Sequence, residues 1–263
     1  MNFKIIQSPQ RLADYVRFFW FSEYNAPKEP SFIHHAFAHH CPEVLFCYKG
    51  QFKYKSAFDT GKSLITGVYG QTQSISRVTS NTDFGILGFY LYPHALTQLF
   101  QMQANELTNQ SVDIKTLYGK EGEILEEKIM LAVNNNQRVK IITDFLEARL
   151  INVRTKFSGT CSSIKTISNA YQAVSASSLT KNNFLSLRQF ERRFKEFSGF
   201  SPKRFLRIAR FNSLLNTPFQ HKNFADIAFE FGYYDEVHFS HDFKQFSGIL
   251  FLKFRGQRRA FYF

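Results

Sequence analysis

The chain has 263 residues, of which 44% are hydrophobic and 21% are charged. This composition excludes a disordered or fibrous protein, and the length suggests about two domains. Because the sequence has neither an apolar run of ~18 residues nor a secretory signal, we expect a cytoplasmic protein that makes no membrane contact. Cys41, Cys47 and Cys161 are odd in number and form no C-x-x-C pair, which disfavours a disulfide framework.

The net charge of +12 is concentrated in the C-terminal part of the chain. Residues 1–153 contain 15 Lys and Arg against 14 Asp and Glu, whereas residues 154–263 contain 18 against 7. Neutralising phosphates requires clustered Lys and Arg, so this imbalance favours a nucleic-acid-binding C-terminal half. We therefore divide the chain into domains 1–153 and 154–263.

Short apolar segments in the N-terminal half predict strands at 44–48, 51–58, 64–69, 73–78 and 84–92. Strands at this spacing are typical of a barrel or sandwich. Helical patterns follow at 95–102, 121–133 and 138–150. The last of these carries an apolar stripe of Val139, Ile142, Leu146 and Leu150. The final two helices would form a hairpin, which either covers the barrel of its own chain or packs against a second copy.

A histidine cluster precedes the first of these strands. His34, His35, His39 and His40 lie just before Glu43, and imidazoles beside a carboxylate can hold a metal ion. The alternative is a loop or a partly buried polar cluster. Because no second metal-binding element follows, we predict no metal and no cofactor. The chain also lacks a Walker-type loop, a nucleophile elbow and a dinucleotide fingerprint, so no enzyme is predicted.

The C-terminal half contains an internal repeat. FERRFKEFSG starts at Phe190, and FSHDFKQFSG starts at Phe239. In each copy three Phe at i, i+4 and i+7 share one helical face, and a Gly follows as the expected helix end. Ser186 and Asp235 stand before the two helices as expected N-caps.

Each of these helices is expected to be the second helix of a helix-turn-helix unit. In the second unit a short apolar helix pattern ends at Gly232, and in the first a weaker pattern runs from Ser178 to Phe184. Ser201-Pro202 starts a connecting helix between the units.

These residues resemble the AraC/XylS family of bacterial transcription regulators over about 160–255. The closest likeness is Ile227-Ala228, Gly232-Tyr233, Asp235, His238-Phe239-Ser240 and Phe243-Lys244. The resemblance implies two helix-turn-helix units joined by a long helix, preceded by a cupin-like effector or dimerisation domain. The expected fold is therefore α+β, with a cupin-like barrel or sandwich and helical hairpin followed by an all-α domain. The sequence departs from the family at Phe184, where the turn usually has Gly, and after Gly248.

Helical geometry then selects the residues that would contact DNA. Because the Phe faces must pack inward, the opposite faces are expected to enter the major groove. The expected base-reading residues are Arg188, Glu191, Arg192, Lys195, Glu236, Val237, His238, Ser240, His241 and Lys244. The residues expected to contact backbone phosphates are Lys203, Arg204, Arg207, Arg210, Arg255, Arg258 and Arg259.

The leading hypothesis is a sequence-specific transcription regulator whose N-terminal half senses an effector, dimerises, or does both. Its partners would be double-stranded DNA, an unidentified small molecule, a second copy of the chain and RNA polymerase. The competing hypothesis is a metal-dependent, cupin-type enzyme with an accessory nucleic-acid-binding domain.

Overall fold

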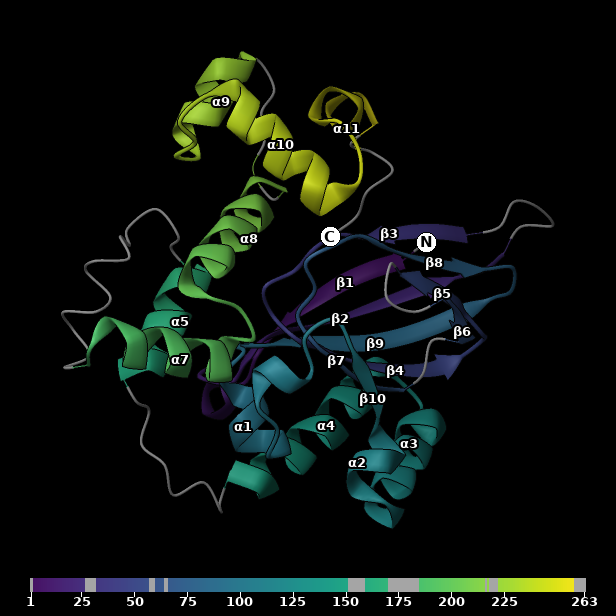
Figure 1. Cartoon of the computed structure of the whole chain (residues 1–263). Coiled ribbons are helices and arrows are strands. Elements are labelled where there is room, and N and C mark those ends of the chain that lie inside the picture. The colour runs from purple at the N-terminus through teal and green to yellow at the C-terminus, as the bar shows by residue number, and fades with distance from the viewer. Residues whose placement is uncertain are drawn as a thin grey trace.

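The computed structural model describes residues 2–26, 32–56, 60–63, 66–150, 159–169, 185–215, 217 and 222–257. Two β-sheets and a set of covering helices form the N-terminal part, and a group of helices forms the C-terminal part (Figure 1). Sheets and helices are thus segregated along the chain, as expected for an α+β protein. No helix among the described residues is long and apolar enough to cross a membrane.

The described strands form two antiparallel sheets. The first has the order β1-β2-β9-β4-β7-β10 and the second the order β3-β8-β5-β6. Their bounds are β1 Asn2–Gln7, β2 Val16–Tyr24, β3 Phe32–Ala36, β4 Glu43–Lys49, β5 Lys53–Ser56, β6 Thr60–Ser63, β7 Gly67–Tyr69, β8 Ser76–Ser80, β9 Phe84–Leu91 and β10 Ser111–Asp113. Both sheets are open, so the expected barrel-or-sandwich is a sandwich and not a closed barrel.

Residues alternate between the two faces of the larger sheet, as the pleat of a strand requires. On β2, Phe19 and Phe21 join the core beneath the helices, whereas Trp20 faces the second sheet. Gly88 pairs with Trp20 across β9 and β2, and a side chain at Gly88 would overlap the indole ring. Glycine at this position therefore makes room for Trp20.

Helices cover the outer face of the larger sheet (Figure 1). They are α1 Ala95–Phe100, α2 Ile114–Tyr118, α3 Lys120–Leu131 and α4 Asn135–Leu150, with short 3-10 turns η1 Gln10–Leu12 and η2 Ala104–Glu106. Ile142 and Leu146 of α4 are fully buried in the core beneath the sheet, and Val139 and Leu150 pack against that core. The apolar stripe therefore covers its own chain, and the alternative in which it packs against a second copy is wrong.

The C-terminal helices are α5 Gly159–Asn169, α7 Leu187–Ser198, α8 Pro202–Leu215, α9 Phe224–Glu230, α10 Glu236–Ser247 and α11 Phe251–Gln257. Ser186 and Asp235 cap the N-termini of α7 and α10, and Gly199 and Gly248 end them with φ of 79° and 72°. These four sequence predictions are confirmed. The segment from Ser178 to Phe184, expected to supply the preceding helix and turn of the first unit, lies outside the described residues.

Phenylalanine rings fill the core of the C-terminal part. Phe190 and Phe194 of α7 and Phe239, Phe243 and Phe246 of α10 are fully buried, as the repeat predicts. The connecting helix α8 adds Phe205, Ile208 and Phe211 to the same core. Two residues of the N-terminal part, Phe37 and Ala38, also belong to it. The two parts of the chain therefore share one hydrophobic core.

Candidate nucleic-acid interface and ligand cavity

The polar face of α7 is exposed where the sequence predicts a DNA-reading surface. Arg188, Glu191, Arg192 and Lys195 are all exposed, while Phe190 and Phe194 on the opposite face are buried. The Ser186 side chain accepts a hydrogen bond from the Gln189 backbone N–H, and the Gln189 side chain accepts one from the Ser186 backbone N–H. This capping box fixes the start of the helix that carries the four side chains.

The corresponding face of α10 is less basic. Glu236, Val237, His238, His241 and Lys244 are exposed, and Ser240 is half-buried. Val237 retains 77% of its accessible surface although it is apolar. An exposed valine can contact the methyl group of a thymine.

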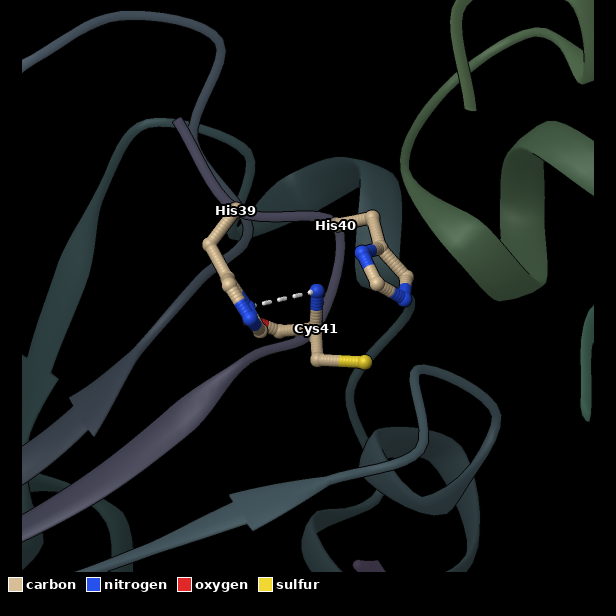
Figure 2. A group of neighbouring side chains, drawn as sticks. All are labelled: His39, His40 and Cys41. Atoms are coloured by element: carbon tan, nitrogen blue, oxygen red, sulfur yellow. Dashed lines mark hydrogen bonds between the residues drawn. The ribbon is translucent and has the colours of Figure 1, made fainter. Parts of the chain in front are cut away.

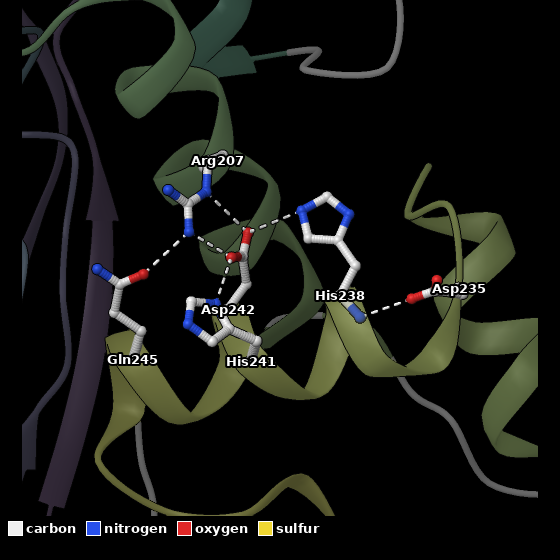
Figure 3. A network of polar contacts seen from close by, with 6 residues as sticks. All are labelled: Arg207, Asp235, His238, His241, Asp242 and Gln245. Carbon is white, nitrogen blue, oxygen red and sulfur yellow. Dashed lines mark hydrogen bonds and ion pairs between the residues drawn. The ribbon is translucent and has the colours of Figure 1, made fainter.

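Arg207, one of the residues expected to contact phosphate, is half-buried and forms an ion pair within the protein. The Arg207 guanidinium of α8 forms a two-pronged ion pair with the buried carboxylate of Asp242 on α10 (Figure 3). A third hydrogen bond, 2.9 Å long, joins Arg207 to Gln245 Oε1. Asp242 raises the pKa of Arg207 by hydrogen bonding and by its charge. Arg207 thus holds α10 against α8, and its expected contact with a DNA phosphate stays a prediction.

The other expected phosphate contacts are placed differently from one another. Lys203 and Arg255 are exposed. Arg204 and Arg210 are half-buried, and the Arg210 guanidinium lies over the Tyr233 ring, 4.9 Å from its centre. Arg258 and Arg259 lie outside the described residues.

A cavity of about 180 Å³ lies between the two sheets. Ten aromatic side chains line it: Phe3, Phe18, Trp20, Phe32, Phe37, Phe52, Tyr54, Tyr69, Phe84 and Tyr90. Asn212 and Leu215 of α8 also line it. The cavity is therefore formed by the sandwich together with the helix that connects the two recognition helices.

Glu43 is the acidic residue among those that line the cavity. Trp20 Nε1 donates a hydrogen bond of 2.7 Å to Glu43 Oε1, and the Tyr90 hydroxyl also bonds this carboxylate. Burial raises the pKa of Glu43 to about 7, against the lowering effect of these two donors. The sequence reasoning treated Glu43 only as a companion of the histidines.

The four histidines of the predicted cluster do not come together. His34 and His35 lie on β3, whereas His39 and His40 lie beside Cys41 with their donor atoms within 4.8 Å of one another (Figure 2). His39 Nδ1 accepts a hydrogen bond from the Cys41 backbone N–H, and Arg17 lies 3.5 Å from Cys41 Sγ. A guanidinium at the thiol opposes a metal cation there. These contacts match the alternative of a buried polar cluster.

Burial lowers the pKa of both His34 and His39 to about 4. The two imidazoles that line the cavity are therefore neutral near pH 7. Lysine and arginine are absent from the lining among the residues that the structure describes.

The sequence reasoning missed Trp20, Tyr90 and Asn212 as site residues. Trp20 is the single tryptophan of the chain, and that was the one available signal. Asn212 contacts His40 and Ala38, which precede it by 172 and 174 positions in the chain. No local sequence pattern therefore marks its role.

Residues 179–257 match the family model of a helix-turn-helix domain, and residues 4–113 match a domain of unknown function (DUF6597). No curated protein shows significant similarity to the chain. Among solved structures, ToxT from Vibrio cholerae is 10% identical with a TM-score of 0.47, covering 90% of this chain and 97% of that one. The AraC-like transcriptional activator CuxR is 13% identical with a TM-score of 0.30, covering 80% of this chain and 85% of that one.

The helix-turn-helix match covers α7 to α11, the elements whose caps and phenylalanine faces repeat. The chain therefore carries a helix-turn-helix DNA-binding domain of the AraC type at its C-terminal end. It is a DNA-binding transcription regulator, with a β-sandwich domain preceding the DNA-binding domain.

Proposed function

We propose that this regulator reads DNA with the exposed faces of α7 and α10, and that a small molecule in the inter-sheet cavity controls the reading. The observation that carries the proposal is that residues 36–41 contact both the cavity and the recognition helix α10. Ala36, Ala38 and His39 line the cavity, and the Ala38 backbone N–H donates a 3.0 Å hydrogen bond to the Phe246 carbonyl near the end of α10.

The end of α7 is supported in the same way. Thr108 Oγ1 of the N-terminal part donates a 3.2 Å hydrogen bond to the Gly199 carbonyl. Gln71, whose backbone lies beside the lining residues Gly70 and Thr72, also packs on Gly199. Ile75 packs against Gly248 at the end of α10. The C-terminal ends of α7 and α10 thus contact Gln71 and Ile75, which adjoin lining residues of the cavity in sequence.

A ligand that moves these segments would change how far apart the two recognition helices are held. Binding to DNA requires both helices to enter successive major-groove segments, about 34 Å apart for one turn. A ligand in the cavity can change DNA affinity only if it binds the DNA-competent arrangement of the helices more tightly or more weakly than the other arrangement.

Footprinting of the full chain across its own upstream region tests the DNA-reading part of the proposal. We expect two protected major-groove segments on one face of the duplex, with an affinity that falls steeply as salt rises. Protection of a single segment, or an affinity independent of salt, would contradict it.

Self-association, if it forms part of the mechanism, needs a surface other than the buried stripe of α4. We propose the outer face of α3, where Ile124, Met130 and Leu131 are exposed together with Val133 just beyond the helix. Sedimentation of the full chain and of Leu131→Glu tests this, with Lys203→Glu on α8 as an exposed control outside this face. A monomeric unchanged protein would contradict self-association, and a Leu131→Glu variant that still dimerises would contradict this face as the surface.

We further propose that the regulator acts in the cytoplasm and that its output passes through RNA polymerase at the bound promoter. Transcription reconstituted from purified components measures the sign of that output. A transcript level that is unchanged when the operator is occupied would contradict it.

A further inference from the structure

The chemistry of the cavity wall restricts what the cavity can hold. Its volume of about 180 Å³ is close to that of an engineered cavity of ~150 Å³ that binds benzene, so one ring with a short chain fits. Ten aromatic side chains line the cavity, and they make the wall largely apolar. The occupant therefore needs a small apolar body.

The polar end of the occupant is set by Glu43. A carboxylate has about four acceptor positions, and Trp20 and Tyr90 occupy two of them. Glu43 lines the cavity, so its carboxylate is within reach of an occupant. Ser22 Oγ lines the same cavity and is buried without a hydrogen-bond partner among the described residues. The wall thus offers acceptors to a ligand that carries donors.

In the part of the wall that the structure describes, an anionic ligand meets no positive charge. Among the described residues that line the cavity there is no Lys or Arg, and the lining imidazoles of His34 and His39 are neutral near pH 7. Arg17, which lies beside the lining residue Cys41, is held by Cys41 Sγ and the Ser168 carbonyl and is not part of the wall. A carboxylate in this space would lose its hydration without gaining a counter-charge, and it would face Glu43.

We propose that the cavity binds a small amine, with its protonated nitrogen at Glu43 and its apolar body among the aromatic rings. The rings contribute in two ways, because they provide apolar contact area and because their faces attract a cation. This inference rests on the proposed role of the cavity as the effector site.

Trp20 supplies the readout, because it is the only tryptophan of the chain and donates directly to Glu43. The full chain is titrated with three probes of similar size, and indole fluorescence is recorded. The probes are 2-phenylethylamine, the neutral 2-phenylethanol and the anionic 3-phenylpropionate. We expect saturable binding of the amine, at least tenfold tighter than that of the alcohol, and no binding of the acid.

Glu43→Gln tests the assignment of the carboxylate. This variant keeps the shape and an acceptor oxygen but loses the charge, so the amine and the alcohol should bind with similar affinities. Calorimetry is run beside the fluorescence titration, because the substitution changes the partner of the indole itself. Glu121→Gln, on the solvent side of α3, is the matched control and should bind like the unchanged protein.

Three results would overturn the proposal. They are tighter binding of the acid than of the amine, equal binding of amine and alcohol by the unchanged protein, and no saturable binding of the amine up to about 10 mM. A preference for the amine that survives in Glu43→Gln would move the nitrogen away from this carboxylate and would overturn it as well.

Measuring DNA affinity in parallel separates this proposal from the one on which it rests. If the amine saturates the cavity and DNA affinity stays unchanged, the ligand class stands and control of DNA reading fails. If the alcohol or the acid binds more tightly and changes DNA affinity, control stands and the ligand class fails.

Discussion

Asn212 of α8 and His40 of the N-terminal part form a buried hydrogen-bonded pair across the boundary between the two parts of the chain. Asn212 Oδ1 lies 2.6 Å from His40 Nδ1 and 3.2 Å from its backbone N, while Asn212 Nδ2 donates to the Ala38 carbonyl over 2.7 Å. The amide nitrogen is thus a donor and the amide oxygen an acceptor, so His40 carries its proton on Nδ1. Burial lowers the pKa of His40 well below its ordinary value, and the ring is neutral.

Asn212→Leu should uncouple the two parts of the chain. The substitution leaves the His40 N–H groups and the Ala38 carbonyl buried without partners, which costs about 1–3 kcal/mol for each unsatisfied group. We expect a lower unfolding midpoint and separate transitions for the two parts, measured by denaturant unfolding. Lys203→Ala on the same helix is the exposed control and should unfold like the unchanged protein. A single transition at the original midpoint would show that the pair does not couple them.

Arg207→Ala should destabilise the DNA-binding part. Asp242 is fully buried, and removing Arg207 leaves its charge without its main partner, which costs about 3 kcal/mol. Chemical denaturation measures the loss. Adding Asp242→Asn should recover part of it, because the uncompensated charge is then gone. If Arg207→Ala instead keeps full stability and weakens binding to every DNA sequence alike, the arginine contacts phosphate after all.

Arg192→Ala and Lys203→Ala should affect DNA binding in different ways. Arg192 lies on the exposed face of α7, so its loss should cost ~1–3 kcal/mol and relax preference at one base pair. Lys203 on α8 should contribute to all sequences equally, and its loss should reduce the salt slope by about 1. Competition binding against a set of single-base operator variants compares them. The same uniform loss for both would place Arg192 on a phosphate.

Glu43 should make stability depend on pH. Its pKa in the folded protein is about 7, above the ordinary 4.5, so the folded state holds the proton more tightly than the unfolded state does. Stability from this group is therefore complete below about pH 4.5 and is lost as pH rises through 7, by roughly 3 kcal/mol in total. Glu43→Gln removes that loss, so its stability advantage over the unchanged protein should grow between pH 5 and pH 8.

The groups around Glu43 do not titrate in that pH interval. Tyr90 has its pKa raised by burial, His34 and His39 titrate near pH 4, and burial raises the pKa of Cys41 despite Arg17. Thermal unfolding of both proteins at matched pH values measures the difference. A difference that is constant from pH 5 to pH 8 would show that the pKa of Glu43 in the folded protein is not raised to about 7.

The DNA-reading helices could be predicted because their determinants are local. Ser186 and Asp235 cap two twelve-residue helices, and the Phe spacing from Phe190 and Phe239 lies within them, as the structure confirms. The outer helices of the sandwich were predicted for the same reason, since an apolar stripe repeats within α4.

The strands β1, β2 and β3 were missed because apolar residues occur on both of their faces. On β2, Phe19 enters the helix-covered core and Trp20 enters the cavity wall, so no alternation of polar and apolar residues marks the strand. The cavity could not be predicted at all. Trp20 and Glu43 meet because β2 and β4 both flank β9, an arrangement that long-range pairing decides.

The membership of Phe37 and Ala38 in the phenylalanine core of the C-terminal part bears on chimeric regulators. A cut near residue 153, where the charge changes, would transplant the helices without the segment that completes their core. A hybrid made there would carry a hole at Phe37 and a foreign surface against Phe246. Residues 36–41 and the segment that carries Ile75 would have to travel with the helices, so the unit that can be exchanged between such proteins is discontinuous in sequence.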